Sequence, residues 1–219
     1  MVSVISEMVS VPADHLTLSG DFVVPDSSRA TVLFVHGVHT SRQDPATRSV
    51  AAELHRAGFG TLAVDLFSET EGRRAEAMSE QRVDIDMLGR RLIAAVDWLG
   101  IQPDARTLPV VLFAAGAEAA AALIAAAALP DEVLTVVSWA GQPELADGFL
   151  ERVRVPVLFV ESGEDPEDLR SSGQAAERLA GPHAVREVRG ASHRLREPGA
   201  LSRAAAVVEE WFTEVHRPT

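Results

Sequence analysis

Short apolar runs alternate along this chain of 219 residues with longer segments whose apolar positions recur every three or four residues. Such runs are typical of strands covered on both faces of a parallel sheet, and such segments are typical of helices. We therefore predict an α/β fold built on a mostly parallel, doubly wound sheet with helices on both faces. Strands are predicted at residues 16–24, 31–35, 61–64, 110–113, 133–139, 155–160 and 184–188. Helices are predicted at residues 45–57, 85–100, 116–129, 168–179 and 198–215.

The sequence shows no sign of a boundary between domains. It contains no internal repeat and no low-complexity linker, so we predict a single domain over residues 1–219. Residues 65–82 are polar and too long for a simple connector. They are predicted to form either a surface excursion over a site or a short helix that carries Ala75 and Met78.

Charge and missing residue types limit the function. The net charge is −12, which disfavours a nucleic-acid or anionic membrane partner, because either needs a basic face. The chain has no cysteine, lysine or tyrosine, so thiol, amine and phenol chemistry are excluded. It also shows neither a signal-peptide pattern in residues 1–12 nor an apolar run long enough for a membrane span. A cytoplasmic location is therefore expected.

Polar residues gather where the predicted strands end. In doubly wound sheets ligands bind beyond the carboxyl ends of the strands, so these exits are the places to look for chemistry. The exits read His-Gly-Val-His at 36–39, Ala-Ala-Gly-Ala-Glu at 114–118, Ala-Gly at 140–141, Glu-Ser-Gly-Glu-Asp at 161–165 and Gly-Ala-Ser-His at 190–193.

In this order the segments resemble the α/β-hydrolase superfamily, specifically small dienelactone-hydrolase-like members without a cap domain. The resemblance extends over residues 31–212 and implies an esterase- or lactonase-like ancestry. It places the family's acid on Asp165 and its histidine on His193. The family's serine nucleophile falls on Gly116, because a family-like Phe-Gly-Ala-Ser-Thr-Gly-Ala aligns with Phe-Ala-Ala-Gly-Ala-Glu-Ala at 113–119.

A glycine at the nucleophile position removes covalent acyl catalysis and leaves other groups in place. Backbone N–H groups at Ala117 and near Val38 are expected to form an oxyanion site. His193, oriented by Asp165, is expected to act as a general base. The predicted function is noncovalent catalysis on a small carbonyl, ester or lactone-like molecule.

Two alternatives stay open. The chain is alternatively a non-catalytic pseudo-hydrolase that binds a small ligand or a protein partner. A register two residues later makes Glu118 a carboxylate nucleophile in a small-x-Glu-x-small turn at 116–120. If Gly116 is the nucleophile position, Glu118 is instead a pocket residue or an acid in the first turn of its helix, where the helix dipole favours it.

Three further side chains enter the prediction. His39 and Trp139 are expected at the pocket, and His36 is expected to fix the loop after its strand. His39, Glu118 and His193 match no local metal motif, so no metal site and no cofactor are predicted. The expected partner is a small molecule, and the sequence makes no prediction of an oligomeric state.

Overall fold

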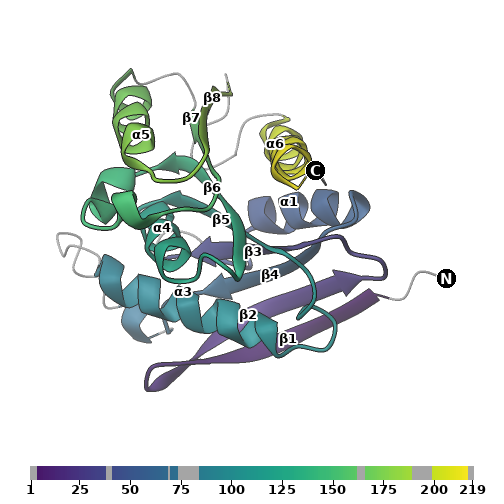
Figure 1. Cartoon of the computed structure of the whole chain (residues 1–219). Helices are drawn as coiled ribbons and strands as arrows, with labels where there is room; N and C mark the ends of the chain where they lie inside the picture. Colours follow the sequence, from purple (N-terminus) through teal and green to yellow (C-terminus); the bar gives the residue numbers. More distant parts are fainter. Residues whose placement is uncertain are drawn as a thin grey trace.

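The computed structural model describes residues 4–37, 41–68, 70–73, 84–161, 166–188 and 199–216. These residues form an eight-stranded sheet in the order β1-β2-β4-β3-β5-β6-β7-β8 (Figure 1). Strand β2 runs antiparallel to both of its neighbours, and the other neighbouring strands are parallel. The strands are β1 (Val4–Ala13), β2 (Leu16–Pro25), β3 (Thr31–His36), β4 (Gly60–Asp65), β5 (Val110–Gly116), β6 (Val133–Gly141), β7 (Val157–Glu161) and β8 (His183–Glu187).

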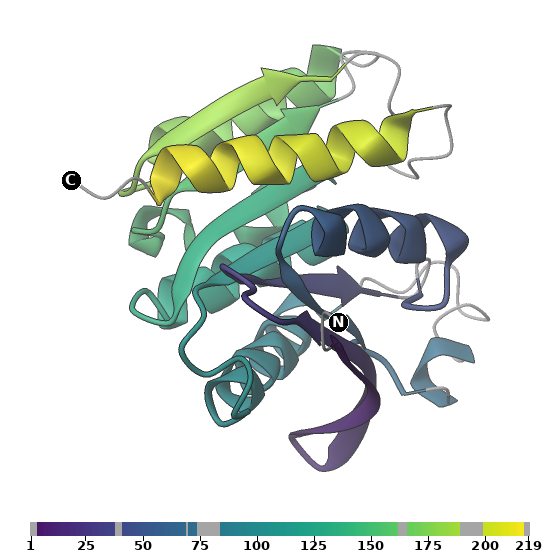
Figure 2. The same ribbon diagram turned by 90° about the vertical axis from the view of Figure 1, so that its right-hand side faces the viewer.

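Helices cover both faces of the sheet. The helices are α1 (Pro45–Arg56), α3 (Ile85–Gly100), α4 (Glu118–Ala128), α5 (Pro166–Arg178) and α6 (Ala200–Val215), with short 3-10 turns at Pro143–Ala146 and Leu150–Arg152. One apolar core joins α3, α4 and α5 to the sheet, and a second core lies under α1 and α6. Figures 1 and 2 show α6 lying beside α1 on the same face. The predicted fold class is confirmed, and the described residues form no separate cap domain.

The central strands are buried because their side chains face a helical layer on each side. All six residues of β3 and the first five of β4 and β5 are buried. This burial explains why these strands appear in the sequence as continuous apolar runs and not as alternating ones.

Two parts of the fold differ from the prediction. Strand β1 was not predicted, although it pairs along its whole length with β2 in a hairpin. Glu7, Met8 and Ser10 of this strand are exposed, and the polar residues among them weaken the apolar signal. The prediction that a helix begins at Gly116 is wrong: Gly116 is the last residue of β5, and α4 begins at Glu118.

A buried ion pair fixes the described part of the segment after β4. Arg91 of α3 has a side chain that is 1% exposed. Its guanidinium donates to the Leu66 carbonyl at 2.7 Å and to both Glu71 carboxylate oxygens at 2.7 and 3.0 Å. The Arg91 hydrogen bonds hold the pKa of Glu71 at about 2. The predicted helical positions Ala75 and Met78 lie outside the described residues.

The parallel strands bring their carboxyl ends to one edge of the sheet. Gly37, Asp65, Gly116, Gly141 and Glu161 follow or end β3, β4, β5, β6 and β7 along that edge. Within the described ranges, no helix is both long enough and apolar enough to cross a membrane.

Candidate functional site

The turn from β5 into α4 has the backbone shape of a nucleophile elbow. Gly116 has a φ of +59°, in the left-handed region that L side chains rarely adopt, and α4 starts two residues later. The Gly116 carbonyl accepts a hydrogen bond from the Gln142 N–H at 3.0 Å, which ties the turn to the end of β6. Strand β5 thus turns into α4 at a left-handed glycine, which has no side chain.

The described residues leave space beside Gly116. Among the described residues, a Cβ built on Gly116 meets one heavy atom within 4 Å beyond its chain neighbours, the Glu118 Oε2 atom at 3.6 Å. Residue 116 itself offers neither a hydroxyl nor any other nucleophile. The space in front of this turn is therefore bordered by a carboxylate.

Glu118 lies between two glycines from neighbouring strands. It is the first residue of α4, and its carboxylate reaches back to Gly37, directly after β3. A Cβ on Gly37 would overlap the Glu118 Oε1 atom. A side chain at residue 37 would therefore displace the carboxylate from its present position between Gly37 and Gly116.

Ala117 is the N-cap residue of α4 and has helical φ and ψ of −66° and −28°. Its carbonyl accepts a hydrogen bond from the Ala120 N–H at 3.1 Å. No side chain caps the helix at this position. The peptide groups of the first turn and the Glu118 side chain are thus the polar groups that α4 presents at the elbow.

His36 ends β3 next to the site and is buried. Burial lowers the pKa of its imidazole to about 4, so the ring is neutral near pH 7. The ring stacks on Phe34 at a centroid distance of 6.5 Å, and the His36 carbonyl accepts from the Leu66 N–H at 2.9 Å. The second of these contacts joins the end of β3 to the residue after β4, and the ring contact lies within β3.

A polar pocket of about 400 Å³ opens beside Gly37. Arg42, Asp65 and Ser68 contribute to its lining. The Arg42 side chain is 10% exposed and pairs with Asp21 at 2.5 Å and with Asp65 at 3.1 Å. Its charge is therefore compensated by two carboxylates within the protein.

Glu161 is a buried acid to which the sequence analysis assigned no role. It ends β7 and is 1% exposed, and its Oε1 atom accepts a hydrogen bond from the Ser172 hydroxyl at 2.6 Å. Burial raises the pKa of Glu161 to about 7, with smaller contributions from Asp168 and Glu144. The available signal was a carboxylate at the end of an otherwise apolar strand, Val-Leu-Phe-Val-Glu.

Trp139, which was expected at the pocket, is buried in the core. It is 1% exposed, and its ring stacks on Phe113 at a centroid distance of 6.2 Å. Its place on β6 turns it toward the layer of α1 and α6. Val38, His39, Asp165 and His193 lie outside the described residues, so the structure brings together Gly116, Ala117 and Glu118 from the predicted set.

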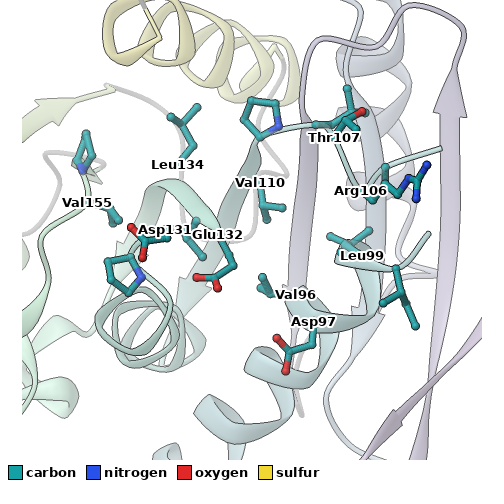
Figure 3. Close-up of a pocket in the computed structure, with 18 of the residues that line it drawn as sticks. Val96, Asp97, Leu99, Arg106, Thr107, Val110, Asp131, Glu132, Leu134 and Val155 are labelled. Carbon is teal, nitrogen blue, oxygen red and sulfur yellow. The ribbon is translucent and has the colours of Figure 1, made fainter. Parts of the chain in front are cut away.

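Another cleft among the described residues is at the opposite edge of the sheet. It has a volume of about 920 Å³ and lies at the amino ends of β5 and β6, beside the end of α3. Figure 3 shows Asp97, Arg106, Asp131 and Glu132 around it. These four side chains belong to exposed residues, and the cleft is far along the strands from Gly116. We therefore place the candidate site at the elbow.

Within the part of the chain that the structure describes, no three histidine or acidic side chains are grouped so as to hold a metal ion.

The chain is similar over nearly all of its length to a solved dienelactone hydrolase from Anabaena variabilis. The two are 37% identical, with 96% of this chain and 98% of that chain covered and a TM-score of 0.90. Est1E from Butyrivibrio proteoclasticus has the same fold with a TM-score of 0.77 at 13% identity, covering 95% of this chain and 98% of that chain. No family model matches the chain.

Two Mycobacterium tuberculosis proteins are each 38% identical to the chain over 209 residues, which is 95% of its length. Both carry the provisional name phosphoribosyl transferase. The chain spans 46% of the length of these relatives.

Proposed function

Because the chain belongs to the dienelactone hydrolase family of the α/β-hydrolase fold, we propose that it acts on a small carbonyl, ester or lactone-like molecule without forming an ester to the protein. The observation that carries this proposal is the elbow at Gly116, which keeps its left-handed φ of +59° and has no side chain. A reaction at this turn requires water, or a proton transfer to and from the bound substrate.

His193 and Asp165 supply the acid–base chemistry in this proposal. Asp165 follows β7 and His193 follows β8, the order in which the resemblance places the acid and the histidine. His193 takes a proton from water as the water oxygen attacks the substrate carbonyl carbon. The proton then passes to the leaving oxygen when its bond to carbon breaks.

Backbone donors carry the negative charge that develops on the substrate oxygen. The N–H groups of Val38 and Ala117 are assigned this role, which needs no side chain and therefore survives the loss of the serine. Arg42, bound to Asp21 and Asp65, is already compensated. We therefore propose a neutral substrate in preference to an anionic one.

A panel of neutral aryl esters and lactones tests the proposal, with the anionic carboxylate-bearing analogues in parallel. We expect turnover of a neutral member and a decrease in kcat of roughly 100-fold or more in His193→Ala. The matched control is His183→Ala, because His183 is an exposed histidine on β8. Unchanged kcat in His193→Ala contradicts the mechanism.

The glycine at the elbow is equally suited to a binding protein that performs no reaction. In that case members of the panel raise the thermal stability of the folded chain without being consumed. We do not propose phosphoribosyl transfer for this chain, because it spans only 46% of the length of the mycobacterial relatives that bear that name.

A further inference from the structure

We infer that two copies of this chain associate through strand β1, which pairs antiparallel with the β1 of a second copy about a two-fold axis at Met8. This inference concerns the rim of the sheet and does not depend on the proposed function. Strands β2, β4 and β3 separate β1 from β5, so the elbow at Gly116 lies outside the proposed interface.

Strand β1 is one of the two strands at which the sheet ends. Among the described residues it pairs with β2 alone, over ten residues and without a shift of register. Figures 1 and 2 show it at the rim of the sheet, away from α1 and α6. Within the described part of the chain, its outer backbone groups have no partner strand, and such groups are a template for another strand.

The two edge strands differ in their protection against such pairing. Edge strands are commonly blunted by charged side chains, especially lysine, or by their short length. Strand β8 has only five residues, and His183, Arg186 and Glu187 are among them. Strand β1 has ten residues, of which Glu7 alone is charged, and the chain contains no lysine. Strand β1 is therefore the edge that is open to pairing.

The hairpin determines which residues of β1 turn their backbone groups outward. Ala13 and Leu16 are ladder partners across a loop of two residues, so they exchange hydrogen bonds with each other, because the loop is too short to hold a further pair. In an antiparallel ladder such pairs alternate with pairs that exchange none. The N–H and C=O groups of Ser6, Met8 and Ser10 therefore point away from β2.

The position of Pro12 agrees with this assignment. Pro12 belongs to the same alternate set as Met8, so its missing N–H lies on the outer side of the strand. Proline is tolerated on an edge strand in this orientation, because the ladder to the neighbouring strand loses no hydrogen bond. A proline introduced at position 8 is expected to leave the pairing of β1 with β2 intact for the same reason.

One register joins two copies over the greatest length. With the axis at Met8, each Met8 lies opposite the partner's Met8, and each Ser6 lies opposite the partner's Ser10. Residues with outward groups then meet each other, and such pairs exchange both of their N–H···O=C hydrogen bonds. The ladder extends from Val4 to Pro12, whereas an axis at Ser6 or at Ser10 gives a shorter one.

The side chains fit this register. Met8 is 79% exposed, more than any other large apolar side chain among the described residues. The axis places it on the same face as the partner's Met8, with the two Cα atoms about 5.5 Å apart. Glu7 falls opposite the partner's Val9, whereas an axis at Glu7 would bring two carboxylates together. Strand β1 is therefore complementary to itself, and we commit to a second copy of the chain as its partner.

Sedimentation velocity of the whole chain over roughly 1 to 300 μM tests the inference. We expect a reversible dimer that dissociates on dilution. Met8→Pro removes the outward N–H at the axis, and Met8→Lys places two like charges side by side. Each variant is expected to raise the dissociation constant at least about tenfold. Ile101→Lys, at a residue that is 73% exposed after α3, is the matched control and keeps the wild-type value.

Cross-linking tests the register, because the chain has no cysteine. In Met8→Cys the two thiols face each other across the axis, at a Cα separation that a disulfide spans. In Ser10→Cys they lie about 13 Å apart along the strands, which is too far. We expect mild oxidation to link Met8→Cys into a covalent dimer and to leave Ser10→Cys unlinked. A mixture of Ser6→Cys and Ser10→Cys is expected to link again.

The results decide the inference without reference to activity. Dimerisation that Met8→Pro and Met8→Lys weaken, together with the expected cross-links, supports it. A chain that stays monomeric over the whole range overturns it, and so does a dimer that both variants leave unchanged, because the copies then meet at another surface. Equal cross-linking of Met8→Cys and Ser10→Cys overturns the register. Thermal unfolding identifies a variant that fails to fold, and the cysteine variants, which keep every backbone donor, then carry the test.

Discussion

A single substitution at residue 116 tests whether the proposed site lacks only a nucleophilic side chain or also the groups that would activate one. A Cβ there meets only Glu118 Oε2 among the described residues, at 3.6 Å, although the left-handed φ of +59° makes any side chain at this position strained. We expect Gly116→Ser to form a covalent adduct with a fluorophosphonate probe, because the proposed mechanism assigns His193 as the base that would activate the new hydroxyl. Intact-mass measurement detects the adduct.

Wild type and the double variant Gly116→Ser/His193→Ala are expected to remain unlabelled. Gly148→Ser is the matched control, because Gly148 is exposed and a Cβ there meets nothing within 4 Å. An adduct on the wild-type chain contradicts the proposal that the site lacks a nucleophile.

At the scale of elements, the ion pair between α3 and the segment after β4 makes the next prediction. Arg91 lowers the pKa of Glu71 from 4.5 to about 2, so this pair stabilises the fold above pH 4.5 and loses its effect as pH falls toward 2. Glu71→Gln is expected to lower the free energy of unfolding by about 2 to 3 kcal/mol at pH 7, because it weakens the pairing of a buried guanidinium.

Chemical denaturation at pH 7 and pH 3 measures this effect. The difference between Glu71→Gln and wild type is expected to shrink at the lower pH, where Glu71 takes up protons in the unfolded chain. Glu53→Gln breaks the exposed pair between Glu53 and Arg56 and is expected to change stability by less than about 1 kcal/mol. An equal loss in both variants contradicts the buried role of Arg91.

The elements also show what the sequence can and cannot predict. The central strands were predictable because burial on both faces leaves a continuous apolar run, as in the six buried residues of β3. The elbow was predictable because a strand runs directly into a helix rich in small residues. Strand β1 was not predictable from the sequence, because half of its residues are exposed to solvent.

The interactions that were not predicted join residues that lie far apart in the sequence. Arg91 and Glu71 are 20 positions apart in the sequence, and Glu161 and Ser172 are 11 apart. Glu118 was recognised as a first-turn acid, but its contact with Gly37 follows from the pairing of β3 with β5. A single sequence shows which groups are ionisable, and the fold determines which of them meet.

For the whole molecule, two buried groups give opposite pH dependences of stability. Burial raises the pKa of Glu161 from 4.5 to about 7, so the folded state keeps a proton that the unfolded chain releases, and stability falls as pH rises from 4.5 to 7. Burial lowers the pKa of His36 from 6.5 to about 4, so stability falls as pH drops from 6.5 to 4. The two effects partly cancel in between.

Glu161→Gln separates the two effects. Relative to wild type, we expect this variant to gain up to about 3 kcal/mol more in free energy of unfolding at pH 8 than at pH 4.5, because the amide never ionises. Urea unfolding at pH 4.5 and at pH 8 measures this gain in free energy of unfolding, and Glu132→Gln serves as the exposed control. A gain that is the same at both values contradicts a raised pKa for Glu161.

The left-handed backbone at Gly116 has a consequence for the stability of the turn. Active relatives of the fold keep an L-amino acid in a strained turn there, a conformation that costs of order 1–3 kcal/mol and has to be compensated elsewhere in the molecule. Gly116 occupies the same backbone region without that steric penalty. A glycine at this turn therefore avoids a backbone strain that any other residue would bring, so substitutions of Gly116 are expected to lower the free energy of unfolding.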